Sequence, residues 1–345
     1  MKQEKMTSRE RVMAAINRKE FDHFPVINPT SIANYECMQI AGASFPQAHT
    51  NAHDMAQIAA LGHTVLGFDS VMPYFSVHLE AEALGCQIQW GDGSGMPVIV
   101  GQALRRMEDF EPPKNFLNKT PCKELLKAIR LLKKQFGNEV AIIGKVIGPW
   151  SLAYNLYGVE NLLLDVILEQ EHTQTFINSL LEIPIAFAKA QFNAGADLIT
   201  WADHVTGDLM SAKLYEEFMF PIHKKAAAQL FSYGPVILHT CGNVMDRLEL
   251  IRRTGFRAFH IDSRNDIKKA VQIAGNDLIL TGSINNPHTL TSGTPLQVRN
   301  EVLANLQSGI QLISPECAIP FKVSNRNLIE LALTAHRAPV DSGAL

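Results

Sequence analysis

The sequence predicts an α/β protein built as a (β/α)8 barrel, or TIM barrel, with a helical extension at the N-terminus and a β-ribbon inserted after the second strand. Short apolar segments alternate along the chain with amphipathic helical stretches, as expected for parallel strands that are buried on both faces. Eight such segments within 345 residues favour a closed barrel over an open sheet. We therefore expect residues 1–345 to form a single barrel domain.

The individual elements follow from these patterns in chain order. The charged segment 1–20 has a helical pattern and supplies the N-terminal extension. The Gly-rich segment 83–100 alternates polar and apolar residues, which is typical of a β-ribbon. The expected strands lie at residues 24–28, 65–72, 140–144, 197–201, 236–240, 258–262, 278–282 and 310–314. The expected helices lie at residues 121–136, 161–194, 212–231, 245–254, 267–274 and 295–307.

Composition restricts the classes of function. The net charge is −3, and no cluster of Lys and Arg provides the electrostatic footprint that nucleic acid or an anionic membrane requires. No apolar run approaches the ~20 residues needed to span a bilayer. The charged start lacks the apolar core of a secretory signal, so we expect a cytoplasmic protein. Five cysteines spread over this length do not suggest a disulfide framework.

Two residues with metal-binding side chains end the fifth expected strand, in the stretch GPVILHTCGN. Alternate residues of a strand point to the same side, so His239 and Cys241 project together. Cys317, in SPECAIP, ends the eighth expected strand. In such barrels all strands present their carboxyl ends to one face, where active sites form, so Cys317 can reach the same ion. One imidazole and two thiolates with an open fourth position are typical of a catalytic zinc site.

These residues have two other interpretations. A histidine and two cysteines can simply be buried core residues, and this is how we interpret Cys37, Cys86 and Cys122. A redox pair of Cys241 and Cys317 is less favoured, because neither lies in a C-x-x-C context. Zinc-type ligands at the ends of two strands favour a metal site over both alternatives.

The motifs LHTCGNV, SPECAIP, GPWSLAYNLYG and TGSINNP resemble the uroporphyrinogen decarboxylase superfamily, and within it the corrinoid-dependent methylcobamide:coenzyme M methyltransferases. The likeness runs from RERVMAAINRKEFDHFPV to SNRNLIEL and so covers nearly the whole chain. It implies a barrel fold and a zinc-binding H-x-C…C motif. The decarboxylases carry an arginine-bearing segment near the N-terminus, whereas PTSIANYECM at 29–38 contains no arginine. A substrate with many carboxylates would lack its cationic partners, so decarboxylation is not expected.

The resemblance implies transfer of a methyl group from a methylated corrinoid to a thiol acceptor such as coenzyme M. A separate corrinoid protein would carry the methylcobamide, and zinc would remove the proton of the acceptor thiol. One alternative is a corrinoid-dependent methyltransferase with tetrahydrofolate as acceptor, and another is a uroporphyrinogen decarboxylase-like protein without decarboxylase activity. A zinc enzyme that takes its methyl group from a folate, and a non-catalytic partner of corrinoid proteins, are less favoured.

Other strand-end residues are candidates for supporting roles. We expect Asp69, Asp203 and Asn285 to face the substrate, Asp69 because it resembles a site aspartate of the decarboxylases. Glu316 could fill the open coordination position when no substrate is bound. Each of these residues could instead be a helix cap or a satisfied loop residue.

Metal-bound histidines are usually oriented by a hydrogen bond from their second ring nitrogen. Asp203 and Asp262 are the candidates to accept that bond from His239. The sulfonate of coenzyme M would also need a cationic or amide-rich pocket. No single arginine is indicated for it, and the options are Arg105, Arg264 and Arg299.

Overall fold

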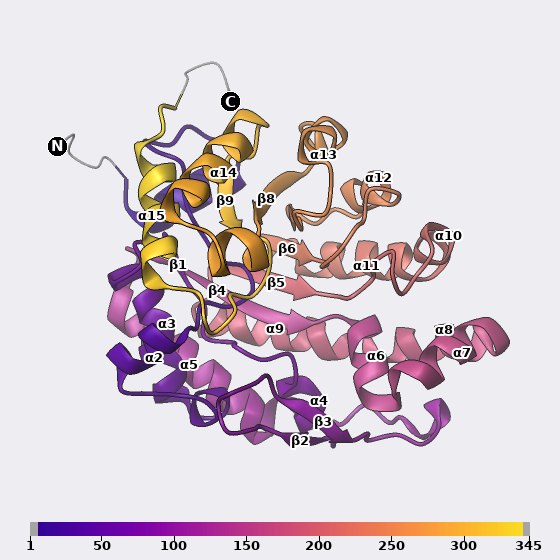
Figure 1. Cartoon of the computed structure of the whole chain (residues 1–345). Coiled ribbons are helices and arrows are strands. Elements are labelled where there is room, and N and C mark those ends of the chain that lie inside the picture. Colours follow the sequence, from indigo (N-terminus) through magenta and orange to yellow (C-terminus); the bar gives the residue numbers. More distant parts are fainter. Residues whose placement is uncertain (1–5, 341–345) are drawn as a thin grey trace.

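The computed structural model describes residues 6–340 and has the α/β architecture that the sequence predicts. Parallel strands form one curled sheet in the order β1-β4-β5-β6-β7-β8-β9, so each strand lies beside the next one along the chain, and helices surround the sheet (Figure 1). The strands of this sheet are β1 (Ser70–Val71), β4 (Ala141–Ile147), β5 (Leu198–Ala202), β6 (Val236–His239), β7 (Ala258–His260), β8 (Ile279–Ile284) and β9 (Leu312–Pro315).

A segment at residues 25–28 takes the eighth strand position and closes the barrel. It was predicted as a full strand, but only Val26 forms a strand-like bridge, to Ile313 of β9. Pro25 and Pro29 flank the segment and lack the backbone N–H that a longer ladder would need. The backbone bonds that join it to both edges of the sheet are Ile27 N to Ile313 O (2.9 Å), Ile313 N to Pro25 O (3.0 Å) and Asp69 N to Val26 O (2.7 Å).

The β-ribbon forms where it was predicted, whereas the second predicted strand is much shorter than expected. β2 (Gln87–Gln89) and β3 (Val98–Gly101) pair antiparallel as a separate two-stranded sheet, where the β-ribbon was expected. The strand predicted at 65–72 is reduced to β1. The preceding helix runs as far as Thr64, and Gly67, with φ of +75°, makes the turn that follows.

Each of the six predicted helical segments contains helix, but the two longest are interrupted, and further helices such as α3 and α15 were not predicted. The segment 161–194 forms three shorter helices, and 212–231 contains a π-helical turn between two α-helices. Pro184 and Pro221 lack the N–H that a continuous helix would use near these breaks. Among residues 6–340, no helix has the length and apolar character needed to cross a membrane.

The helical elements of the described chain are α1 (Ser8–Ile16), α2 (Tyr35–Ala41), η1 (Gln47–His49), α3 (Ala52–Thr64), α4 (Leu79–Ala83), η2 (Met107–Asp109), η3 (Phe116–Asn118), α5 (Thr120–Phe136), α6 (Pro149–Tyr157), α7 (Val159–Leu168), α8 (Gln170–Leu180), α9 (Glu182–Ala194), α10 (Ala212–Leu214), η4 (Tyr215–Met219), α11 (Phe220–Leu230), α12 (Leu248–Arg252), α13 (Ile267–Ala274), η5 (Asn286–Thr291), α14 (Pro295–Gln307) and α15 (Asn325–Arg337).

The N-terminal helix α1 packs against β1, β4 and β9 at the amino end of the barrel. Thr7 and Glu10 form a capping box at its start. Its Arg11 is 1% exposed and donates hydrogen bonds to Asp69 at 2.6 Å and to Asp22 at 2.7 Å. The extension predicted from the charged N-terminal segment therefore closes the end of the barrel that lies opposite the strand carboxyl ends.

Asp69 belongs to this closed end, so the prediction that it faces the substrate is wrong. β1 begins only at Ser70, and Asp69 therefore precedes its strand rather than ending it. Its buried carboxylate accepts hydrogen bonds from Arg11 (2.6 Å), His336 Nε2 (2.9 Å) and the backbone N–H of Val26 (2.8 Å). These contacts hold the pKa of Asp69 below its usual value in spite of burial.

Arg11→Met tests the contribution of this end of the barrel to stability. The change leaves the buried carboxylate of Asp69 without its guanidinium, and we expect the free energy of unfolding to fall by about 3–5 kcal/mol. Arg106→Met is the matched control, because its ion pair with Asp109 is exposed to solvent and should contribute little to stability. Urea denaturation of both variants measures the difference, and equal losses would contradict this assignment.

Candidate metal site

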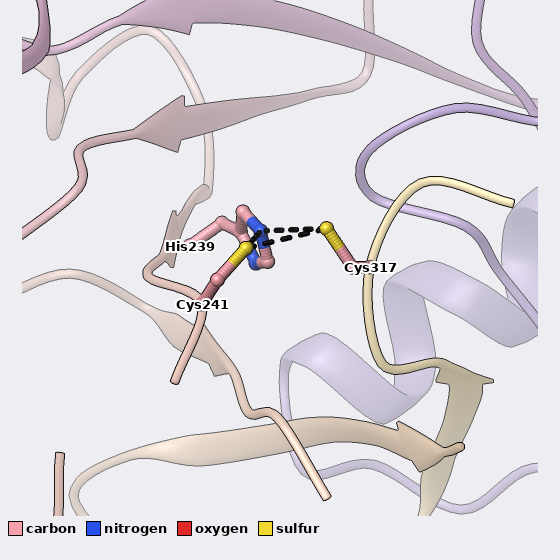
Figure 2. Close-up of side chains that lie close together, drawn as sticks. All are labelled: His239, Cys241 and Cys317. Carbon is pink, nitrogen blue, oxygen red and sulfur yellow. Dashed lines mark hydrogen bonds between the residues drawn. The ribbon is translucent and has the colours of Figure 1, made fainter. Parts of the chain in front are cut away.

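His239, Cys241 and Cys317 converge at the carboxyl ends of the strands, as the sequence predicts. Figure 2 shows the three side chains pointing toward one another, two from the end of β6 and one from the segment after β9. His239 Nε2 lies 3.1 Å from Cys241 Sγ and 3.6 Å from Cys317 Sγ. The two sulfur atoms lie 3.2 Å apart although 76 residues separate them in the chain.

The three ligand atoms fit a tetrahedral zinc ion. Zn–S bonds of about 2.3 Å and Zn–N bonds of about 2.0–2.1 Å correspond to ligand–ligand distances of about 3.6–3.8 Å. The observed triangle is slightly smaller, so small side-chain rotations would admit the ion. A disulfide is not formed, because the sulfur separation of 3.2 Å far exceeds a bond of about 2.05 Å. Both cysteines are half-buried.

The two thiols have unequal acidity. The hydrogen bond between Cys241 and Cys317 lowers the pKa of Cys317 well below its usual range. The same bond, together with burial, raises the pKa of Cys241. A divalent cation that binds both sulfur atoms would displace the remaining proton.

The turn after Cys241 is fixed by two side chains from the loop after β7. Gly242 has φ of +88°, which favours glycine, and its N–H donates to the carboxylate of Asp262 at 2.8 Å. Asn265 accepts from Val244 N at 2.9 Å and donates to Gly242 O at 2.9 Å. Asn265 was not predicted as a site residue, because an asparagine in a loop has no pattern that marks it. It positions the backbone that carries Cys241.

Asp203 holds the backbone near His239 and does not reach its ring. Its N–H donates to His239 O at 3.0 Å. Its buried carboxylate accepts from Ser151 N at 2.9 Å, at the start of α6, and pairs with His223 Nε2 at 3.1 Å. A Cβ on Gly148 would lie 2.3 Å from this carboxylate, so the residue before α6 must be glycine for the carboxylate to fit. Because Ser151 and His223 engage this carboxylate, its position does not support the prediction that Asp203 faces the substrate.

Asp203 and Asp262 were the predicted acceptors for the second ring nitrogen of His239, and neither of them accepts a hydrogen bond from it. Within residues 6–340, Nδ1 of His239 is buried and has no hydrogen-bond partner. The carboxylate of Asp262 is engaged by Gly242 N and by Arg264, and that of Asp203 by Ser151 and His223. The prediction is wrong because backbone N–H groups and the side chains of His223 and Arg264 already engage these carboxylates.

Glu316 and Asn285 lie at the mouth of the barrel, but their side chains form hydrogen bonds with the surrounding loops. Glu316 accepts from Asn286 N at 2.8 Å and from the backbone and hydroxyl of Ser263, and burial raises its pKa. It does not belong to the group of potential metal ligands, so the prediction that it fills the open coordination position is not met. Asn285 caps η5 through His288 N at 2.7 Å and donates to Ser263 Oγ at 2.9 Å, so its expected role toward the substrate has no support.

Two residues near the cluster were given no role by the sequence patterns. His204, beside Asp203, lies 3.4 Å from the hydroxyl of Tyr154, and burial and the charge of His239 lower its pKa. Lys145 is a single charged residue in the apolar run of β4 and is 2% exposed. The sequence signal for Lys145 was present, because a lysine inside a buried strand needs a partner.

Comparison with known proteins gives consistent matches over almost the whole chain. A family model described as uroporphyrinogen decarboxylase (URO-D) matches residues 7–338. The chain is 33% identical over 326 residues to the methylcobamide:CoM methyltransferase MtbA of Methanosarcina acetivorans, a match that covers 93% of this chain and 95% of that protein. It is 30% identical over 336 residues to the methylated-thiol–coenzyme M methyltransferase of Methanosarcina mazei, with coverage of 97% and 90%.

A solved structure gives the same result for the fold. The structure of a methyltransferase from Methanosarcina mazei superposes with a TM-score of 0.92 at 28% sequence identity. The match covers 96% of this chain and 98% of that one.

Gly148→Ala tests the close approach of Asp203 to the start of α6. The added methyl group would lie 2.3 Å from the carboxylate, and we expect a loss of about 1–3 kcal/mol in the free energy of unfolding. Gly95→Ala is the control, because no atom lies within 4 Å of its added Cβ and it should change stability by less than about 0.5 kcal/mol. Chemical denaturation compares the two, and an unchanged Gly148→Ala variant would show that Asp203 is not tightly held.

Proposed function

The chain belongs to the uroporphyrinogen decarboxylase family and is a methyltransferase, and from this premise we propose that it transfers a methyl group from a methylcobamide to a thiol acceptor such as coenzyme M. The convergence of His239, Cys241 and Cys317 at the mouth of the barrel is the observation that carries the proposal. The relatives named methylcobamide:CoM methyltransferases support this choice of donor and acceptor.

The three converging residues would hold a zinc ion as the resident metal. Bound zinc supplies a Lewis acid that lowers the pKa of a thiol, so that the thiol reacts at neutral pH. Cys241 and Cys317 contribute two negative charges that offset the charge of the ion, which keeps an acceptor sulfur electron-rich. Their half-buried position leaves one side open to the mouth of the barrel.

The methyl group would arrive from outside the chain, on a separate corrinoid protein that docks over the mouth. The acceptor thiolate attacks the methyl carbon, so that a carbon–sulfur bond forms while the carbon–cobalt bond breaks. Both electrons of the broken bond stay with cobalt, which leaves as cob(I)alamin. The chain holds the acceptor at the strand ends and fixes the ligands through the turn that Asp262 and Asn265 hold.

Metal content tests the ligand assignment. We expect about one zinc ion per chain in the parent protein, and at least about tenfold weaker zinc binding in Cys241→Ser and Cys317→Ser, because each loses a thiolate ligand. Cys86→Ser is the control, since Cys86 is buried against Asn155 O and should not affect zinc. Competition with a chromogenic chelator measures the affinities. Parent-like zinc binding in both serine variants would refute the assignment.

Turnover tests the reaction. We expect the zinc-loaded protein to demethylate free methylcobalamin when coenzyme M is added, as followed by the absorbance of cob(I)alamin. If tetrahydrofolate supports turnover and none of the thiols does, then tetrahydrofolate is the methyl acceptor instead of coenzyme M. A zinc-loaded protein that is inactive with both acceptors would indicate a family member without this activity and would overturn the proposal.

A further inference from the structure

Lys145 is a buried lysine inside the barrel that forms no ion pair in the described part of the chain, although the charge of the buried Glu80 acts on it. Its Nζ donates to Thr30 O at 3.2 Å and lies 4.4 Å from the centre of the Tyr74 ring. No ion pair within residues 6–340 includes it, although its residue is only 2% exposed. An ammonium group has three donors, and among the described residues only Thr30 O accepts one of them. Lys145 therefore has hydrogen-bonding capacity that the described chain does not use.

The register of the sheet places Lys145 just below the metal ligands. Lys145 pairs with Thr200 of β5, and Ala202, two residues further along β5, pairs with His239 of β6. A Cβ on the neighbouring Gly144 would meet Gln191 of α9, so Gly144 faces outward and Lys145 faces the barrel interior. Burial lowers the pKa of Lys145 to about 8, and nearby groups that include Glu80, Cys317 and Cys241 oppose this shift.

His49 and His78 add unused polar atoms near the same side chain. Neither ring nitrogen of His49 has a hydrogen-bond partner among the described residues, and Nδ1 of His78 has none. The His49 ring stacks on Phe45 with centroids 3.9 Å apart. Burial lowers the pKa of both histidines, and the nearby charge of Lys145 lowers each further. Buried polar atoms without partners mark a place where a ligand or water completes the hydrogen bonding.

We propose that Lys145, assisted by His49, binds an anionic group at the far end of the thiol acceptor. The acceptor class would be short thiols that carry a sulfonate or a carboxylate. This inference rests on the proposed function, because the thiol end of the same molecule must lie at the metal site. An anion there would receive N–H donors from Lys145 and His49 and would neutralise the buried charge.

The arginines that the sequence offered for this role are engaged or remote. Arg264 pairs with Asp262 at 3.1 Å and lies near Asp208. Arg299 donates to Glu330 at 2.8 Å on the surface. Arg105 is exposed, in the segment that follows the β-ribbon. Lys145, by contrast, faces the barrel interior and uses one hydrogen-bond donor, to Thr30 O.

Binding of ethanesulfonate, which has no thiol, tests the pocket without any methyl transfer. We expect calorimetry to detect binding to the parent protein and at least about tenfold weaker binding to Lys145→Met, because a charged hydrogen-bonding partner is lost. Lys189→Met is the matched control, since Lys189 also lies over an aromatic ring, that of Tyr233 at 5.2 Å, but on the outer helix α9. Equal affinity in the parent and Lys145→Met would overturn the inference.

Steady-state kinetics with three thiols connects the pocket to the acceptor. For 2-mercaptoethanesulfonate and 3-mercaptopropionate we expect Lys145→Met to raise KM at least about tenfold, while KM for the uncharged 2-mercaptoethanol stays unchanged. The ratio between the first two thiols in the parent protein shows whether sulfonate or carboxylate is preferred. An equal rise in KM for charged and uncharged thiols would refute a role in anion recognition.

His49→Phe provides a second variant should Lys145→Met fail to fold, as judged by its circular dichroism. The phenylalanine keeps the stack on Phe45 and removes both ring nitrogens. We expect weaker ethanesulfonate binding and a higher KM for the anionic thiols alone, and parent-like values would contradict the assigned pocket. If ethanesulfonate binding depends on Lys145 but no thiol supports demethylation, then the proposed function fails while the anion pocket stands.

Discussion

Closure of the barrel by residues 25–28 is the constraint on which the site depends. β6 and β9 are three positions apart in the sheet, and in a flat sheet, with strands about 4.8 Å apart, their ends would lie ~14 Å from each other. The observed distance between His239 Nε2 and Cys317 Sγ is 3.6 Å. Curling of the sheet, completed where the segment 25–28 bonds to β9 and to Asp69 before β1, removes that separation and brings the two strand ends to one point.

The carboxylates near the mouth serve the backbone more than the metal. Asp203 and Asp262 each accept an N–H from a neighbouring loop or helix start, and Glu316 does the same from two loops. Because their oxygens are engaged in this way, the sulfur atoms of Cys241 and Cys317 are the groups left to face a bound cation at the cluster. Lys145 inside the barrel provides a positive charge below them. The site therefore combines two sulfur atoms at the mouth of the barrel with a lysine deeper inside it.

The positions of the strands and of the residues at their ends could be predicted from periodicity in the sequence. The hydrogen-bond partners of individual side chains could not, because several donors compete for the same acceptor. Alternation along β6 was enough to place His239 and Cys241 on one side, and strand order placed Cys317 with them. Asp69 was misplaced because its strand begins at Ser70, five residues later than predicted, which puts Asp69 before the strand and at the opposite end of the barrel. The position of Lys145 depends on a contact with Thr30, 115 residues away, which no local pattern encodes. Likewise, the orientation of Asp203 depends on the helix start at Ser151.

The separation of the three proposed ligands along the chain would link metal affinity to folding. Two ligands lie at the end of β6 and the third follows β9, with β7, β8 and their helices between them. An ion held by all three would act as a cross-link between two segments that the unfolded chain does not keep together. Because such an ion prefers the folded chain, its binding free energy adds to the stability of the barrel by mass action. The stability of the folded protein would then depend on the concentration of free metal as well as on the packing of its core.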